Sequence, residues 1–193
     1  MKIEYEAKFL NIDKDEIRRR LLESGAELIK PEFLQKRFNF HLPGDLREDK
    51  AWLRVRNEGD KITLSLKKIE GKEIHHQKEL TVDVSDFDTS VAILKAIGCE
   101  IRMYQETKRE LWKLDGAEVT IDSWPFLEPF VEVENDSEQN VRSVAEKLGF
   151  DWGKAVFGPV GKVYKMKYKI GPSIFDGEDM RLTFDGKNPF ENL

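Results

Sequence analysis

Cysteine and histidine are scarce in this sequence. The chain of 193 residues contains one cysteine, Cys99, and three histidines. One cysteine cannot form an internal disulfide, and the sequence has no Cys/His cluster that would hold a structural zinc ion. We expect Cys99, which follows a helix-ending glycine, to be a small buried side chain. The scarcity of cysteine fits a reducing compartment, and a chain of this length can bury a substantial core.

Long apolar runs and an excess of one charge are also missing. No stretch approaches the roughly 20 apolar residues that span a bilayer, and too few residues precede the first expected strand for a signal peptide. We therefore expect no membrane segment and a cytoplasmic protein. Lysine and arginine together number 32, aspartate and glutamate 37, and the net charge is -5. Because the two signs nearly balance, no general nucleic-acid-binding surface is indicated, and any phosphate binding must be local.

What the sequence contains instead is a repeated alternation of charged and apolar residues. It begins at residues 2–9, which read as a β-strand. Successive side chains of a strand point to opposite faces, so the charged Glu4, Glu6 and Lys8 share one face and the apolar residues share the other. Carboxylates two residues apart on a strand are about 7 Å apart, close enough to act on one cation. Taken alone, this stretch is equally typical of an amphipathic strand with one solvated face.

The remaining chain predicts an α+β domain over residues 1–170. Helices are expected after Asp13, after Ser85 or Asp86 and after Asp136 or Ser137, because a capping residue precedes an apolar stripe that ends at glycine. The tail, residues 171–193, receives no confident element. Alternation and turn residues predict strands at residues 2–9, 33–41, 52–56, 62–68, 77–84, 104–114, 117–122, 130–134 and 160–170.

Two architectures fit this alternation. In a sandwich the charged faces would be solvated, whereas in a closed barrel with helices packed outside they would line the lumen. Periodicity alone does not distinguish the two. Charges buried in a lumen without partners would cost several kcal/mol per ion, so a charged lumen should hold water, metal and an anion. The candidate lumen set is Glu4, Glu6, Glu79, Asp122, Glu132 and Glu134 with Lys8, Arg54, Arg56, Lys67, Arg109 and Lys162.

The residue types in this set suit a phosphate chain that carries metal. Arginine makes bidentate contacts with phosphate oxygens, and lysine supplies a point charge. Carboxylates favour hard cations such as Mg²⁺ or Mn²⁺, which in turn bridge phosphates. The basic residues lack the interleaved aromatic residues that bind single-stranded nucleic acid.

The ordered motifs resemble the CYTH superfamily, the triphosphate tunnel metalloenzymes that include class IV adenylyl cyclases, thiamine triphosphatases and inorganic triphosphatases. The resemblance covers about residues 1–169 and implies a closed eight-stranded antiparallel β-barrel, or tunnel, with helices packed outside. The motifs that carry it are Glu4-x-Glu6-x-Lys8, Leu53-Arg54-x-Arg56, Leu66-Lys67, Lys78-Glu79-Leu80, Thr107-Lys108-Arg109-x-x-Trp112, Ile121-Asp122, Phe130-x-Glu132-x-Glu134 and Lys162-x-Tyr164.

The resemblance also implies residue roles. Glu4, Glu6, Glu132 and Glu134 look like ligands of Mg²⁺ or Mn²⁺, with Asp122 and Glu79 supporting them. Lys8, Arg54, Arg56, Lys67, Arg109 and Lys162 look like triphosphate ligands. The catalytic set is Glu4, Glu6 and Lys8.

Some positions depart from the pattern of class IV cyclase-like members. The second strand has Arg37 in place of an acid and Asn39 in place of an aromatic residue, and residues 126–129 replace a glycine-rich turn. Neither change removes a phosphate or metal position, but both could alter which organic group lies beside the triphosphate. The strand register at Arg109 and Lys162 also stays open, because a one-residue slip exchanges the two faces.

We expect a metal-dependent triphosphatase acting on a triphosphate-bearing small molecule, because hydrolysis requires only an activated water and stabilisation of the leaving phosphate. Alternatives are a class IV adenylyl cyclase, which makes cyclic AMP and pyrophosphate from ATP, and a non-catalytic module that binds polyphosphate or nucleotide. A homodimer is possible, and the sequence does not fix the oligomeric state.

Overall fold

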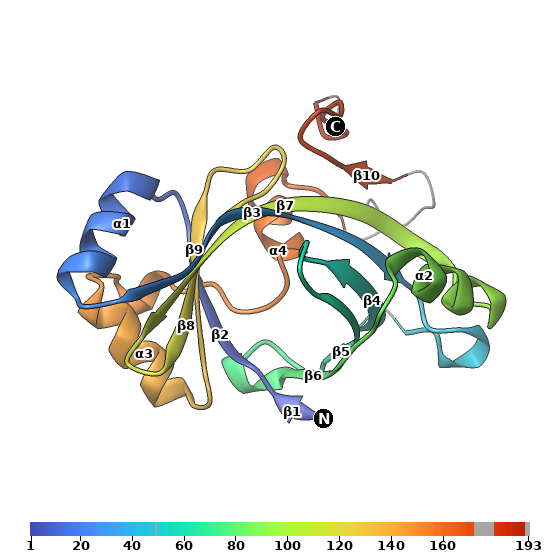
Figure 1. Cartoon of the computed structure of the whole chain (residues 1–193), viewed down its shortest axis with the longest axis horizontal. Coiled ribbons are helices and arrows are strands. Elements are labelled where there is room, and N and C mark those ends of the chain that lie inside the picture. The colour runs from blue at the N-terminus through green and yellow to red at the C-terminus, as the bar shows by residue number, and fades with distance from the viewer. Residues whose placement is uncertain (49, 172–179, 192–193) are drawn as a thin grey trace.

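Most strands of this chain form one antiparallel sheet that is rolled into a nearly closed barrel (Figure 1). The computed structural model describes residues 1–48, 50–171 and 180–191. The α+β class and the barrel are as expected from the sequence. The strands of the barrel are β1 (Lys2–Ile3), β2 (Tyr5–Phe9), β3 (Glu27–Phe40), β4 (Ala51–Asn57), β5 (Ile62–Ile69), β6 (Gln77–Asp83), β7 (Ile101–Leu114), β8 (Ala117–Ser123) and β9 (Phe130–Asn135).

The amino-terminal segment closes the barrel. The strand order is β1-β6-β5-β4-β3-β7-β8-β9-β2, so that β1 and β2 lie at the two ends of the sheet. Only Glu4 separates β1 from β2 along the chain, and its backbone N–H donates to the carbonyl of Gln77. Eight strands were expected and nine are found, because the first strand is divided at Glu4. Each neighbouring pair on this path is antiparallel.

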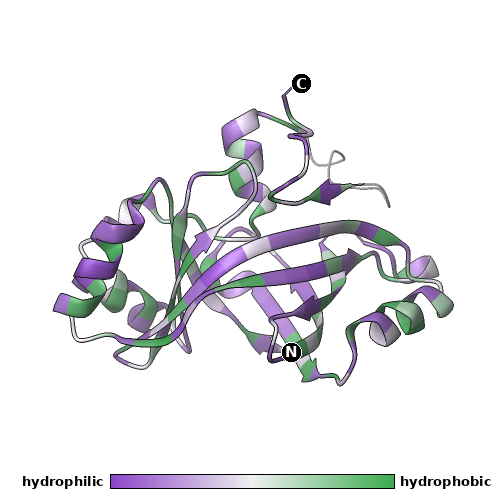
Figure 2. Ribbon diagram, turned by 45° about the horizontal axis from the view of Figure 1, so that its top comes forward, coloured by the Kyte–Doolittle hydropathy of each residue, from purple (hydrophilic) through white to green (hydrophobic). Residues whose placement is uncertain are grey.

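The helices formed by residues 14–23, 87–96 and 138–147 pack outside the barrel and cover its apolar face. Asp13, Asp86 and Ser137 cap the helices, as the sequence predicts. In Figure 2 hydrophobic and hydrophilic residues alternate along the strands. The helices are α1 (Lys14–Glu23), α2 (Phe87–Ala96), α3 (Glu138–Lys147) and α4 (Gly161–Tyr168), with short 3-10 turns η1 (Gly44–Leu46), η2 (Ile74–His76) and η3 (Trp152–Lys154).

The main hydrophobic core therefore lies between the barrel wall and the helices, not inside the barrel. Ile17 and Leu21 of α1 and Val144 of α3 pack with Trp112 of β7 and Val119 of β8. A second cluster beneath α2 joins Leu94 and Cys99 to strand residues of β3 and β4, and Cys99 is buried as expected. With the apolar side chains directed outward under the helices, the other face of each strand is left for the polar lumen.

The predicted strand over residues 160–170 is wrong, because this segment forms α4. Val163 and Tyr164 are buried, and Tyr164 packs in one cluster with Val160 and Tyr168, a spacing of four residues that belongs to a helix face rather than to a strand. Pro159, just before the helix, is a start signal that the alternation of lysines obscured.

The carboxyl-terminal tail contributes a short strand that was not predicted. β10 (Arg181–Leu182) runs parallel to β7 beside Tyr104 and Gln105. Phe190 packs on Tyr164 of α4, with ring centroids 5.2 Å apart. Among the residues described, no helix is long and apolar enough to cross a bilayer.

Candidate active site

The barrel encloses a cavity of about 490 Å³ whose wall is dominated by charged side chains. Of the lumen set predicted from the sequence, Asp122 does not line the cavity: it is fully buried behind Arg109. The other members line it, namely Glu4, Glu6, Glu79, Glu132 and Glu134 with Lys8, Arg54, Arg56, Lys67, Arg109 and Lys162. The solvated-face alternative is therefore excluded for these strands.

Lys162 reaches the cavity from a helix instead of a strand. It lies in the first turn of α4, and its Nζ donates to the carbonyl of Phe157 at 3.2 Å. The register at Arg109 is also fixed. Arg109 faces the cavity, whereas Glu110 lies on the outer side and pairs with Arg18 of α1 at 2.9 Å.

The cavity wall also contains basic residues that were not predicted from the sequence to belong to the site. They are Arg37, Lys50, Arg102 and Lys165. Arg37 could have been found, because in the predicted strand over residues 33–41 it shares one face with the polar Gln35 and Asn39, whereas most residues of the other face are apolar. Trp52 also lines the cavity, whereas Trp112 is buried in the main hydrophobic core. Basic side chains thus outnumber acidic ones in the cavity of a protein whose net charge is -5.

One acidic group lies where β2 meets β9. Glu6 is the register partner of Glu134, and Lys8 is the partner of Glu132. The Nζ of Lys8, which is 2% exposed, contacts the Glu6 carboxylate and lies 3.2 Å from Glu132 Oε1. Burial alone would lower the pKa of Lys8, but Glu132 and Glu6 outweigh it and raise that pKa. Burial, followed by the charge of Glu6, raises the pKa of Glu134 to about 7.

A second group lies where the divided first strand meets β5 and β6. The Nζ of Lys67 is 2.9 Å from Glu4 Oε2 and 3.4 Å from Glu79 Oε2, and Arg54 Nη2 donates to Glu79 Oε1 at 2.9 Å. Burial raises the pKa of Glu4 to about 8. Burial acts in the same direction on Glu79, but a hydrogen bond with Glu4 and the charges of Arg54 and Lys67 outweigh it and lower the pKa of Glu79. The surroundings thus push the pKa values of the two carboxyl groups in opposite directions, upward for Glu4 and downward for Glu79.

Arg109 bridges the buried Asp122 to the cavity wall. Its Nε donates to Asp122 Oδ1 at 2.7 Å, and its Nη2 lies 2.5 Å from both Asp122 Oδ2 and Glu132 Oε2. Burial would lower the pKa of Arg109, but Asp122 and Glu132 outweigh it and raise that pKa. Asp122 thus orients the guanidinium and supports the site from behind.

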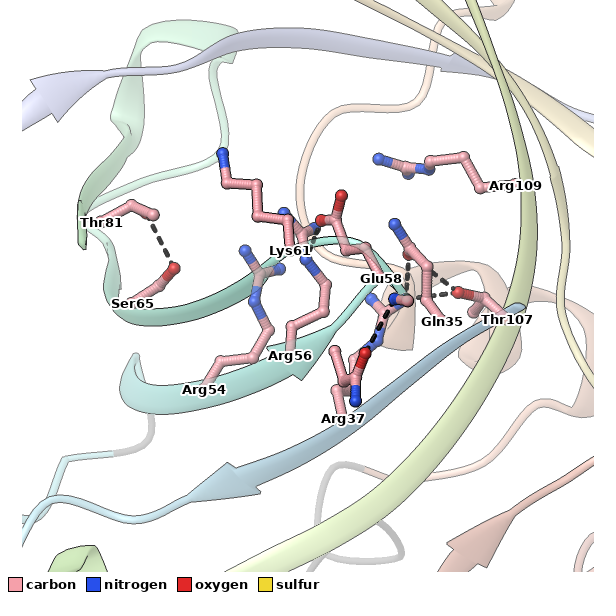
Figure 3. A network of polar contacts seen from close by, with 12 residues as sticks. Gln35, Arg37, Arg54, Arg56, Glu58, Lys61, Ser65, Thr81, Thr107 and Arg109 are labelled. Carbon is pink, nitrogen blue, oxygen red and sulfur yellow. Dashed lines mark hydrogen bonds and ion pairs between the residues drawn. The ribbon is translucent and has the colours of Figure 1, made fainter. Parts of the chain in front are cut away.

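Neighbouring arginines present unsatisfied donors to the cavity. The buried Nε atoms of Arg37, Arg54 and Arg56 have no hydrogen-bond partner. Arg56 Nε lies 2.7 Å from Glu58 Oε1, at an angle that makes no hydrogen bond. Burial and the nearby charge of Arg54 lower the pKa of Arg56 to about 10. Figure 3 shows Arg54, Arg56 and Arg109 reaching from β4 and β7 into the same space.

The carboxylates suit a hard divalent cation, although they do not form a closed cage. No three Asp, Glu, His or Cys side chains in the described ranges are grouped closely enough to hold a metal ion alone. Mg²⁺ is usually held by one or two carboxylates, with substrate phosphates and water completing its coordination. Glu6 and Glu134, whose proximity contributes to the raised pKa of Glu134, are such a pair.

Several solved structures share this fold. A conserved hypothetical protein from Pyrococcus furiosus is 22% identical, with a TM-score of 0.66, over 79% of this chain and 94% of that chain. A Vibrio parahaemolyticus protein, provisionally called an adenylate cyclase, is 13% identical, with a TM-score of 0.71, over 85% of this chain and 98% of that one. A Hippeastrum protein, provisionally called an adenylyl cyclase and described as having a dominant triphosphatase activity, is 15% identical, with a TM-score of 0.56, over 90% of this chain and 99% of that one. Identities this low show a common fold.

The sequence itself identifies the family. A search of curated proteins finds no significant match. The model of the CYTH domain, however, matches residues 2–153, which include all the strands of the barrel. With most of its length matched and its charged cavity inside the barrel, this chain belongs to the CYTH domain family, whose members bind triphosphates and depend on metal.

Proposed function

We propose that this protein is a divalent-metal-dependent enzyme that hydrolyses a triphosphate bound in the barrel. The observation that carries the proposal is the pair of buried Nε atoms of Arg54 and Arg56, which make no hydrogen bond and belong to side chains that line a cavity with carboxylates in its wall. A buried charged donor without a hydrogen bond costs about 1–3 kcal/mol or more. An anion with many oxygens would satisfy both donors together.

The basic residues bind the phosphate chain. Arg54, Arg56 and Arg109 offer guanidinium groups whose planar donors match phosphate oxygens. Lys8 and Lys67 supply point charges from β2 and β5. Lys162 approaches from α4, and its only hydrogen bond among the described residues is to a backbone carbonyl, so its charge is free to meet the phosphate chain.

Glu6 and Glu134 would hold the metal, with Glu4 and Glu132 beside them on the same strands. Their oxygen donors suit Mg²⁺ or Mn²⁺. When bound, such an ion neutralises phosphate charge and helps to activate water. Lys8 keeps Glu6 and Glu132 in place through its two contacts.

Hydrolysis then requires one displacement at phosphorus. A water oxygen forms a bond to the terminal phosphorus while the bridging P–O bond breaks, and the electron pair leaves with the diphosphate. Arg54 and Arg56 stabilise the charge on the leaving oxygen. The water's proton passes to the carboxylate of Glu6 on β2.

Adenylyl cyclase activity is the second candidate, since the Vibrio protein of the same fold is provisionally called an adenylate cyclase. Cyclisation of ATP needs a recognised nucleoside and a deprotonated 3'-hydroxyl in addition to the triphosphate site. A non-catalytic polyphosphate-binding module is a weaker candidate, because pure anion binding would need few carboxylates in the cavity.

The experiment is to incubate the protein with tripolyphosphate, ATP or thiamine triphosphate in the presence of Mg²⁺, Mn²⁺ or EDTA. Orthophosphate, pyrophosphate and cyclic AMP are measured in parallel. We expect orthophosphate release that requires the metal. Absence of turnover with every substrate and metal would refute the enzyme, and cyclic AMP with stoichiometric pyrophosphate would favour the cyclase.

Two variants connect activity to the cavity. Glu4→Gln should lose metal-dependent turnover, whereas Glu23→Gln, on the exposed side of α1, should retain it. If both variants behave like the native protein, the cavity is not the active site.

A further inference from the structure

Arg37 differs in its ion-pair partners from Arg54, Arg56 and Arg109, which line the same cavity. Arg54 pairs with Glu79, Arg56 lies beside Glu58, and Arg109 pairs with Asp122. Arg37 has no carboxylate partner among the residues described, although it is only 5% exposed. Burying a guanidinium without a counter-charge is costly. A position of this kind needs an anion from outside the protein.

The guanidinium of Arg37 is nevertheless held in a defined place. Its Nη2 donates to Gln35 Oε1 at 2.7 Å and contacts Thr107 Oγ1, and the group lies 4.7 Å from the centroid of the Trp124 ring. The Nε stays without a partner. Figure 3 shows Gln35, Arg37 and Thr107 beside the other arginines. Neutral oxygen acceptors and an aromatic face fix the orientation of the group but leave its charge uncompensated.

Burial, followed by the charges of Arg56 and Arg54, lowers the pKa of Arg37 well below its ordinary value. The same neighbours exclude a cation from this position, and a neutral ligand would leave the three positive charges facing one another. The ligand group that fits is therefore an anion. The planar, bidentate donors of the Arg37 guanidinium favour a phosphate group.

Arg37 lies on β3, the strand next to β4, which carries Arg54 and Arg56. It is the register partner of Arg56 on β4 and of Gln105 on β7. Neighbouring strands are about 4.8 Å apart, so its guanidinium adds a donor next to those of Arg54 and Arg56 and outside the set that the triphosphate is expected to use.

We propose that Arg37 binds a further phosphate of the same chain, so that the cavity is built for linear inorganic polyphosphates of four or more phosphates. The inference rests on the proposed function, since it presupposes that a triphosphate lies along Arg54 and Arg56. It makes Arg37 a specificity-determining residue that distinguishes a longer chain from tripolyphosphate.

The test is a binding measurement without turnover. Dissociation constants of tripolyphosphate and tetrapolyphosphate are determined by calorimetry in EDTA for the native protein and for Arg37→Gln. We expect the native protein to bind tetrapolyphosphate roughly tenfold or more tighter than tripolyphosphate, because one charge-assisted contact is added. Arg37→Gln should abolish this preference and change the affinity for tripolyphosphate less than threefold. As the matched variant, Arg56→Gln should weaken both ligands.

The outcomes separate this inference from the proposed function. If tripolyphosphate does not bind at all, the proposed function fails. If tripolyphosphate binds but tetrapolyphosphate binds no tighter, or if Arg37→Gln weakens both ligands equally, the assignment of Arg37 to a further phosphate is overturned. Thermal melting without ligand tests whether Arg37 has a structural role instead. Arg37→Gln should melt no lower than the native protein, since a buried unpaired charge is removed. A clearly lower melting temperature of the variant would identify Arg37 as a structural residue.

Discussion

Replacing Arg109 by methionine should destabilise the protein far more than most single substitutions. Arg109 makes two hydrogen bonds to Asp122 and one to Glu132. Asp122 is fully buried, and its other hydrogen bond comes from the Thr120 hydroxyl at 3.1 Å. Arg109→Met therefore leaves a carboxylate in the protein interior without its counter-charge.

The expected size follows from the burial of the pair. Breaking a buried ion pair by removing one partner costs about 3–5 kcal/mol. For a chain of this length about 1 kcal/mol corresponds to a melting-temperature change of roughly 2–4 °C, so we expect a loss on the order of 10 °C. Melting is followed by circular dichroism or calorimetry at pH 8 without ligand.

Arg19 offers a matched control. It also contacts two carboxylates, Glu16 and Glu23, but its side chain is 56% exposed and the pairs lie in solvent on α1. Exposed pairs contribute little, so Arg19→Met should melt close to the native protein. Equal melting temperatures for Arg109→Met and Arg19→Met would refute the reasoning.

The effect of pH gives an independent test. Burial raises the pKa of the Asp122 carboxyl to about 6 even beside Arg109, and loss of Arg109 raises it further. The group is therefore protonated at pH 5, whereas at pH 8 the folded state must either bury its charge or take up a proton, and both cost free energy. The destabilisation should therefore be smaller at pH 5 than at pH 8. Adding Asp122→Asn to Arg109→Met removes the unpaired charge and should recover part of the loss at pH 8. A loss that is independent of pH, with no recovery in the double variant, would point to packing instead of charge.

Other predictions address the site and the scaffold separately. Glu6→Gln should lower the metal-dependent rate by on the order of a hundredfold without lowering the melting temperature, and an unchanged rate would exclude Glu6 from the metal site. Burial raises the pKa of Glu4 to about 8 and that of Glu134 to about 7 from an ordinary 4.5, so each keeps a proton in the folded state that the unfolded chain releases. The metal-free protein should therefore melt at lower temperature as pH rises from 5 to 8. A melting temperature that stays constant or rises over this range contradicts the prediction. Arg56→Ala should raise KM for tripolyphosphate more than it changes kcat, and the opposite split would place its role in the chemical step. Ser137→Ala removes the cap of α3 and should cost about 1 kcal/mol of stability at unchanged kcat, as unfolding in urea and the steady-state rate would show.

The alternation of charged and apolar residues made most of the strands predictable. Each strand buries one face under helices, so its period of two is preserved in the sequence, as at Arg54 and Arg56 beside Leu53 and Val55. Alternation does not tell which face is enclosed, because solvated and lumen-facing charges look alike. That distinction depends on how the barrel closes, with β1 paired to β6 at one end of the sheet and β2 paired to β9 at the other. Such pairing is a long-range property that alternation does not contain.

Two errors have local causes. Lysines at residues 165, 167 and 169 imitate a strand's alternation, whereas the buried Val163 and Tyr164 are adjacent and belong to a helix. Arg37 was noted only as a departure from the family pattern, although it shares one strand face with Gln35 and Asn39, opposite the apolar Leu34, Phe38 and Phe40. In both cases the burial of neighbouring apolar residues was the better guide than the positions of the charges.

The division of the first strand at Glu4 also has a consequence for folding. Lys2 and Ile3 pair with Glu79 and Lys78, while residues 5–9 pair with residues 131–135. β2, near the amino terminus, therefore pairs with β9, which lies far along the chain. Contacts of such long sequence separation form slowly, because their loop-closure entropy must be overcome first. Since Glu4, Glu6 and Lys8 lie on this closing segment, the cavity gains these three residues only when the segment pairs with β6 and β9 and closes the barrel. Ligand-binding competence should consequently appear late in refolding, together with complete closure and after the helix-covered wall of β7, β8 and β9 is in place.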